Sequence, residues 1–133
     1  MRLVLDTNVI VSALLKPESV PGRALAAIWS AGASVLYDAR IGREYGDVLR
    51  RPKFRAIPSR AVDDFLATLV ERGEVPSVVP PWSGVMNDDD DRIFVEVALA
   101  GRADAIVTGN LRDYPRGLGF EVHPPATLLA MLT

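Results

Sequence analysis

Apolar residues recur along the chain in two kinds of pattern. Short, nearly continuous runs indicate strands that are buried on both faces, and longer stretches with apolar residues every three or four positions indicate helices. Strands are predicted at 2–6, 33–37, 75–79, 105–108 and 120–122. Helices are predicted at 9–15, 23–31, 40–51, 59–72, from the acidic run at 87–91 to residue 100, and at 126–132. This alternation predicts a three-layer α/β/α sandwich with a mainly parallel, five-stranded sheet.

Proline, glycine and serine residues mark the ends of several of these elements. Pro52 and Gly73 follow two of the predicted helices, and Ser59 is placed to cap the helix that Gly73 ends. Pro76 interrupts the predicted strand 75–79, and residues 109–119 are expected to form a long turn. The breaks are short and no repeat or low-complexity segment is present, so residues 1–133 are expected to form one domain.

The amino-acid composition argues against a membrane-spanning or disulfide-rich protein. Hydrophobic residues make up 49% of the 133 positions and charged residues 24%, and no apolar run reaches the roughly 18 residues of a membrane span. The first residues read as a strand and not as a signal peptide. The chain has no cysteine, which excludes a disulfide framework, a thiolate metal site and a cysteine nucleophile. We therefore expect a cytoplasmic protein without a membrane partner.

Charge is distributed unevenly although the formal net charge is only −2. Residues 40–60 carry seven basic side chains against two acidic ones, and residues 87–96 carry five acidic side chains against one arginine. A basic face beside an acidic pocket would hold a phosphate backbone next to a bound cation. An ordinary mixed surface explains the same charges equally well. The candidate nucleic-acid contacts are Arg40, Arg43, Arg50 and Arg51.

Candidate chemistry lies where the predicted parallel strands end, because function gathers beyond the carboxyl ends of such strands. Asp6 follows the first strand, Asp90 and Asp91 precede the helix before the fourth, and Asn110 and Asp113 follow the fourth. Glu44 lies on the helix after the second strand. Converging carboxylates without a lysine or arginine among them would bind a hard divalent cation, and all-oxygen ligands indicate Mg²⁺ or Mn²⁺.

Each of these acids also has a plain structural explanation. Asp6 could be a turn residue, Glu44 could be a surface charge, and part of the acidic run could be stabilised by the helix dipole. Counting back from the apolar positions of the following helix places Asp90 and Asp91 toward the interior, whereas Asp88 and Asp89 are expected to face water.

Four segments together resemble one known family, the PIN-domain proteins, and within it the VapC-type ribonucleases that act as toxins of toxin–antitoxin modules. The segments are 3–9 (LVLDTNV), 47–54 (DVLRRPKF), 90–92 (DDR) and 106–115 (IVTGNLRDYP). Each motif alone is weak, but the four occur in the family's order over nearly the whole chain.

The resemblance implies a metal-dependent endoribonuclease that uses Mg²⁺ or Mn²⁺, acts on RNA, forms a homodimer and is blocked by a small antitoxin protein. Asp6, Glu44 and Asp91 match the family's first three acids, with Asp90 beside the third. Asn110 stands where many members have an acid, and Asp113 is the candidate substitute. Asn8 and Thr108 would orient the acids. An amide oxygen accepts a cation but brings no charge, which favours weaker metal binding.

Two other functions remain open at this stage. A haloacid-dehalogenase-like phosphatase also has an aspartate after its first strand and a threonine after a later one. Here Asn8 stands where that family needs an acid or a small residue, and the chain lacks the activating lysine after Thr108. The other alternative is a PIN fold that has lost cleavage and acts by binding RNA or protein, which Asn110 and the acidic net charge favour.

Overall fold

The computed structural model describes residues 1–133 and contains a four-stranded, wholly parallel sheet in the order β2-β1-β3-β4. The strands are β1 (Arg2–Leu5), β2 (Ser34–Val35), β3 (Ala105–Val107) and β4 (Glu121–His123). Leu3 of β1 lies opposite Ala105 of β3, and Ile106 of β3 lies opposite Val122 of β4. The first strand is therefore internal, so Asp6, which follows it, lies at the middle of the sheet's carboxyl edge.

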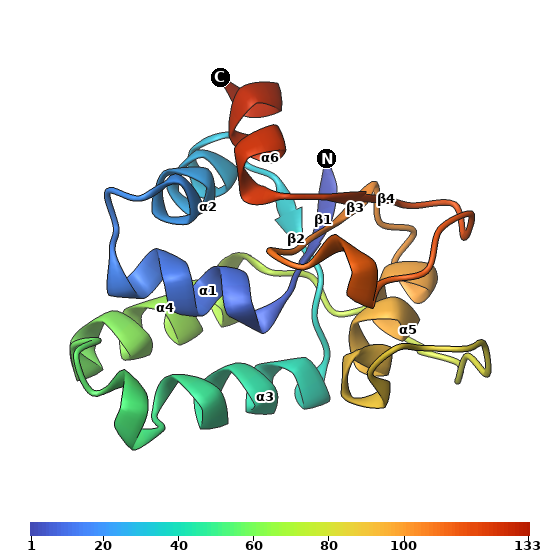
Figure 1. The fold of residues 1–133 in the computed structure, drawn as a ribbon, viewed down its shortest axis with the longest axis horizontal. Coiled ribbons are helices and arrows are strands. Elements are labelled where there is room, and N and C mark those ends of the chain that lie inside the picture. Colours follow the sequence, from blue (N-terminus) through green and yellow to red (C-terminus); the bar gives the residue numbers. More distant parts are fainter.

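Helices cover both faces of the sheet, as a parallel sheet requires, and the fold is the predicted α/β class. In Figure 1, α2 and α6 pack together at the top, α3 runs along the bottom, and α5 lies at the lower right. The bounds are α1 Thr7–Leu15, α2 Val20–Ser30, α3 Ala39–Leu49, α4 Ser59–Arg72, α5 Arg92–Ala100 and α6 Pro125–Leu132. Short 3-10 helices are η1 (Pro52–Phe54), η2 (Asp89–Asp91) and η3 (Leu111–Asp113).

The core explains why these segments take their places. Leu3, Val4 and Leu5 of β1 have no exposed surface, and β3 is buried along its length. The strongly amphipathic α3 buries Ile41, Tyr45, Val48 and Leu49 on one stripe and leaves its charged residues exposed, except for the partly buried Glu44. Asp38 caps α3 by accepting hydrogen bonds from the backbone N–H groups of residues 40 and 41.

One of the five predicted strands, the third in chain order at 75–79, does not form. Glu74 makes a single bridge with Leu36, through hydrogen bonds between Glu74 N–H and Val35 C=O and between Tyr37 N–H and Glu74 C=O. Beyond it, Pro76 has no N–H to donate and the chain leaves the sheet. The apolar residues that suggested a strand, such as Val75 and Val78, are exposed at 54% and 71%.

Local differences elsewhere are small. The first helix begins at Thr7 and not at residue 9, so Asp6 itself is its N-cap. Ser59 is the first residue of α4 and makes no capping bond, because Pro58 occupies the N-cap position. The predicted long turn at 109–119 contains η3. None of the helices has the length and apolar character needed to cross a bilayer.

Candidate functional site

Asp6 is the most enclosed acid at the carboxyl edge of the sheet, with 5% of its surface exposed. Its Oδ2 accepts hydrogen bonds from Thr108 Oγ1 at 2.8 Å and from Asn8 Nδ2 at 3.3 Å. Burial raises the pKa of Asp6, and the hydrogen bond from Thr108 lowers it in part. The carboxylate is thus held in one orientation through its Oδ2.

Thr108 and Asn8 are fixed by the loop that follows β3. Thr108 Oγ1 accepts a hydrogen bond from Asn110 N–H at 3.0 Å, and Asn8 Oδ1 accepts one from Gly109 N–H at 3.1 Å. The two predicted supporting residues therefore tie the end of β1 to the end of β3. Their rotamers, and that of Asp6, follow from the register of the two strands.

Glu44 approaches from α3, which lies beneath the end of β1. The adjacent Tyr45 is fully buried and donates a hydrogen bond from its hydroxyl to the Leu5 carbonyl, which fixes the helix against the strand. Thr7 Oγ1 then donates to Glu44 Oε2 at 3.2 Å. Glu44 is partly buried and oriented toward the site. Thr7 was not singled out from the sequence, although it lies between Asp6 and Asn8.

Asp91, the last residue of η2, has the most perturbed carboxyl group of the site. Its pKa is raised to about 7 by burial, and then by the negative charges of Asp6, Asp88, Asp113 and Glu44. These charges act on Asp91 because the acids face one region and no basic side chain pairs with Asp6, Glu44, Asp91 or Asp113. Residues separated by more than a hundred positions in sequence are therefore brought together in space.

The rest of the acidic run divides as follows. Asp88, Asp89 and Asp90 are exposed. Asp88 caps η2 by accepting a hydrogen bond from Asp90 N–H at 3.0 Å, and Asp89 pairs with Arg92. The side chain of Asp90 is therefore not brought into the acidic cluster, in contrast to that of Asp91.

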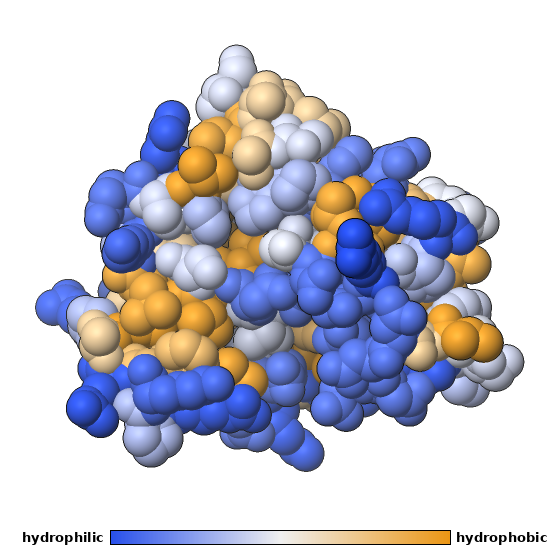
Figure 2. All heavy atoms as spheres, viewed as in Figure 1, coloured by the Kyte–Doolittle hydropathy of each residue, from blue (hydrophilic) through white to orange (hydrophobic).

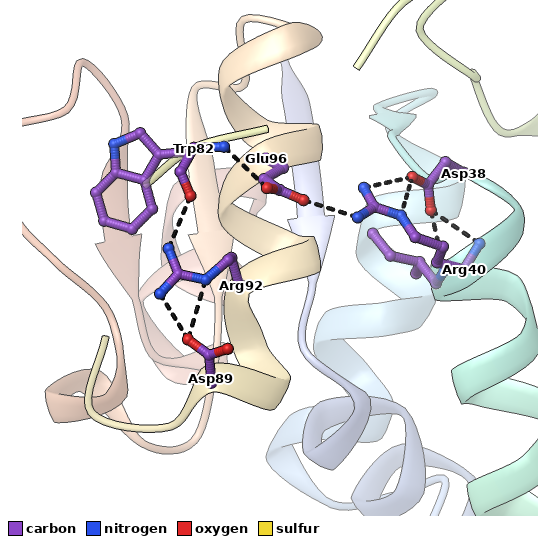
Figure 3. A network of polar contacts seen from close by, with 7 residues as sticks. Asp38, Arg40, Trp82, Asp89, Arg92 and Glu96 are labelled. Carbon is purple, nitrogen blue, oxygen red and sulfur yellow. Dashed lines mark hydrogen bonds and ion pairs between the residues drawn. The ribbon is translucent and has the colours of Figure 1, made fainter. Parts of the chain in front are cut away.

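A polar network holds η2 and α5 in place (Figure 3). Arg92 donates to the carbonyls of Trp82 and Gly84 at 2.7 and 2.8 Å and pairs with Asp89. Glu96, 6% exposed, accepts from Trp82 N–H at 2.9 Å and from Arg40 Nη1 at 2.7 Å. The 80–90 loop is thus fastened to α5, and α5 to the start of α3, so Asp91 is positioned relative to the helix that carries Glu44.

Asp113 and Tyr114 come from η3 and the residue after it. Asp113 is partly buried, and its charge raises the pKa of both Asp6 and Asp91. Tyr114 is 4% exposed, and its hydroxyl has no hydrogen-bond partner. Burial and the charges of Asp6 and Asp91 raise the pKa of Tyr114. Sequence analysis did not single out Tyr114; its position directly after Asp113 was the available signal.

Asn110 lies at the rim of the site and not inside it. It is exposed, and it contributes with Asn8, Ser12 and Pro125 to a hollow of about 220 Å³ on one side of α1. Its backbone N–H supports Thr108, as described above. Asp113, by contrast, is near enough to Asp6 and Asp91 to shift their pKa values. Of the two candidates for the fourth acidic position, Asp113 is therefore the one beside the other acids.

The four candidate arginines differ in their surroundings. Arg40 is engaged by Asp38 and Glu96, and Arg50 pairs with Asp63 at 2.8 Å. Arg43 and Arg51 are exposed and form no ion pair. Arg51 also lines a groove that reaches Glu44.

The chemistry of the donors suits a hard divalent cation. Asp6, Glu44, Asp91 and Asp113 offer only carboxylate oxygens, and none of the four forms an ion pair with a basic side chain. Their spacing is looser than a finished coordination sphere, because no three acidic or histidine side chains lie close enough together to hold one ion. Side-chain rotation of Asp91, Asp113 or Glu44 toward the fixed Asp6 would be needed to share a cation.

Comparison with known proteins places this geometry in a family. A family model described as the PIN domain matches residues 2–112. An uncharacterized protein from Methanocaldococcus jannaschii is 30% identical over 112 residues, which is 83% of this chain and 71% of that protein. No solved structure matches this sequence significantly. The matched span includes Asp6, Glu44 and Asp91, and the chain belongs to the PIN domain family.

Proposed function

We propose that this PIN domain is an endoribonuclease that hydrolyses RNA phosphodiesters at the cluster of Asp6, Glu44, Asp91 and Asp113, with Mg²⁺ or Mn²⁺ bound there. PIN domains are generally nucleases, which sets the reaction class. The observation that carries the proposal is the convergence of these acids at the carboxyl edge without a basic partner. Burial, and then the charges of Asp6, Asp88, Asp113 and Glu44, raise the pKa of Asp91 to about 7 in agreement with this. A site with that much uncompensated negative charge is arranged for a cation.

The residues of the cluster would divide the work. Asp6, immobilised by Thr108 and Asn8, would be the fixed ligand, and Asp91, Asp113 and Glu44 would close around the ion. A divalent cation held there would polarise the phosphate and lower the pKa of the attacking water. Hydrolysis then adds water across one P–O bond and leaves one phosphate end and one hydroxyl end. Thr7 keeps Glu44 directed at the site.

The test is cleavage of a mixed RNA panel by the purified protein with Mn²⁺, with Mg²⁺ and with a chelator. We expect metal-dependent cleavage by the wild type and a loss of at least about 100-fold in Asp6→Asn, because the fixed ligand loses its charge. Asp64→Asn is the matched control, since Asp64 is exposed on α4 and its side chain forms no ion pair or hydrogen bond. Equal cleavage in the chelator, or none by the wild type on any RNA, would contradict the proposal.

A second candidate is a PIN fold that binds RNA or protein without cleaving it. The observation that favours it is that no three acids lie within reach of one ion. Calorimetric titration with Mn²⁺ separates the two functions. The nuclease should show a saturable site that disappears in Asp91→Ala, whereas a module that only binds RNA or protein should show none.

Two partners belong to the same proposal. We propose a small antitoxin protein that covers the acidic cluster, and a homodimer as the working form, both on the strength of the family. Light scattering of the purified chain tests the dimer. Coexpression with the product of the neighbouring reading frame tests the antitoxin: it should co-purify and suppress cleavage.

A further inference from the structure

A groove of about 300 Å³ leads away from the acidic cluster between α1 and α3. We call it the η1 groove. It begins at Thr7, Asn8 and Glu44, passes Val48 on the next turn of α3, and ends at Arg51, Lys53 and Phe54 of the η1 segment. On the face seen in Figure 2, apolar residues gather over α1, and hydrophilic residues border them along α3. The groove thus joins the acids at one end to basic and aromatic side chains at the other.

The basic side chains at the far end are free to bind an anion. Arg51 and Lys53 are exposed, and neither lies within 4.0 Å of a carboxylate. This distinguishes them from Arg40 and Arg50, whose charges are already paired. A phosphate that enters the groove would meet two uncompensated positive charges after it leaves the repulsive field of the acids.

Phe54 gives the groove an aromatic wall. The ring is partly buried and packs against the core, and Lys53 Nζ lies 5.0 Å from its centroid. An exposed cation–π contact is worth only about 0.5–1 kcal/mol. A base stacked on an aromatic ring is worth about 1–3 kcal/mol. A base can therefore replace the lysine on the ring, which releases the ammonium group to bind the phosphate of the same nucleotide.

We propose that the η1 groove binds the nucleotide next to the cleaved linkage, with its base stacked on Phe54 and its phosphate held by Arg51 and Lys53. The occupant is a single-stranded RNA segment, which rests on the proposed function. A base must leave its stack to lie on a side chain, so a duplex cannot use this subsite without being opened.

A separate cavity continues the path of the η1 groove past Phe54. Arg51 and Phe54 also line a second cavity of about 360 Å³ on the other side of η1, between the end of α3 and the start of α4. Arg55 and Ser59 contribute polar atoms there. The RNA strand can therefore continue past the aromatic ring, across η1, over a surface that again carries positive charge.

Binding in the absence of metal tests this subsite independently of cleavage. The probe is fluorescein-labelled oligoadenylate, single-stranded or paired with oligouridylate, and fluorescence anisotropy is recorded in a chelator at several salt concentrations. We expect Phe54→Leu, which keeps an apolar side chain against the core, to weaken single-strand binding at least about five-fold. Phe54→Trp should restore it. Duplex binding should be the same in all three proteins.

The charges are tested by Arg51→Gln and Lys53→Gln. Each should lower the slope of log affinity against log salt by about 0.7, the value expected for one lost phosphate contact on a single strand. Arg23→Gln is the matched control, because Arg23 is exposed on α2 and forms no ion pair.

Three results would overturn the subsite: unchanged single-strand binding by Phe54→Leu, an equal loss for duplex and single strand, or slopes for Arg51→Gln and Lys53→Gln no different from that of Arg23→Gln. Circular dichroism of each variant identifies one that fails to fold, and Phe54→Trp then decides the aromatic contact. A wild type that binds as described but cleaves nothing would refute the nuclease and leave the subsite standing.

Discussion

At the scale of single residues, the site is a balance between one fixed carboxylate and several repelling neighbours. Asp6 is held by two side-chain donors, while Asp91 is destabilised as an anion by burial and by the other acids. This asymmetry predicts that the two residues respond differently to pH and to substitution.

Without metal, Asp91 should make the protein less stable as pH rises. Its folded-state pKa of about 7 lies above the value of an unfolded aspartate, so its protonated form favours the folded state. That stabilisation is present below about pH 4 and is lost as pH rises through about 7. Relative to Asp91→Asn, the free energy of unfolding of the wild type should fall by about 1–2 kcal/mol over this range, allowing for solvent screening.

Urea unfolding in a chelator at several pH values measures this difference. Asp64→Asn is again a suitable control, because its carboxylate is exposed and isolated from the cluster. A constant difference between wild type and Asp91→Asn across the range would show that Asp91 is not held among the other acids.

Tyr114→Phe should not destabilise the protein. The hydroxyl is buried without a hydrogen-bond partner, and a buried unsatisfied polar group costs about 1–3 kcal/mol. Removing it should therefore leave the free energy of unfolding unchanged or raise it by up to about 1 kcal/mol. A loss of more than 1 kcal/mol would mean that the hydroxyl does form a hydrogen bond in solution, with Asp6 as the nearest acceptor.

Sequence predicted some of these residues and missed others for a physical reason. Asp6, Asp91 and Asp113 could be found because each follows or precedes a buried strand or helix at the carboxyl edge. Arg40, in contrast, was predicted to contact RNA, but it is paired with Glu96. The two residues are 56 positions apart, so no local sequence pattern indicates the pair. Tyr114 is in the site through tertiary packing of η3, which periodicity does not encode.

At the scale of elements, α5 carries the network that positions Asp91. Glu96 joins α5 to Arg40 of α3 and to the backbone of the 80–90 loop. Arg40 and the Trp82 N–H both bind the nearly buried carboxylate of Glu96. The network therefore depends on Glu96 more than on Arg40 or Trp82.

Glu96→Ala should cost about 1–3 kcal/mol, because Trp82 N–H loses its acceptor and Arg40 loses one of two carboxylates. Arg50→Gln provides the comparison: it breaks a pair whose side chains are 54% and 65% exposed, and should cost less than about 1 kcal/mol. Chemical unfolding of both variants measures the contrast. Equal costs would show that Glu96 contributes no more than a surface ion pair.

The strands and helices also show which features the sequence pattern predicts and which it does not. Apolar runs predicted four of the strands because the central strands are buried on both faces and the edge strands on one, and the class of the fold followed from their alternation with helices. Residues 75–79 have the composition of a strand but form no bridge: the single bridge of this segment is at Glu74, and Pro76 has no N–H to extend it. The first helix begins two residues earlier than predicted, after its N-cap Asp6. The helix 59–72 has the predicted bounds, but Pro58 and not Ser59 occupies its N-cap position.

At the scale of the whole molecule, metal binding should be coupled to folding. A cation that binds the folded cluster but not the unfolded chain stabilises the protein by about 2.7 kcal/mol at 100 times its Kd. For a chain of this size that corresponds to a rise in Tm of roughly 10 °C. Differential scanning fluorimetry with Mn²⁺ should show the rise in the wild type and in Asp64→Asn and not in Asp6→Asn. A similar rise in Asp6→Asn would place the ion elsewhere.

The parallel topology has a consequence for synthesis in the cell. Asp6 is made first, but β1 has its central neighbour only when β3 has been made, and Asp113 follows β3. A chain growing on the ribosome therefore carries scattered acids and no assembled cluster until about residue 113 has emerged. If the domain cleaves RNA, the messenger and the ribosome that produce it are spared until the segment through Asp113 has emerged.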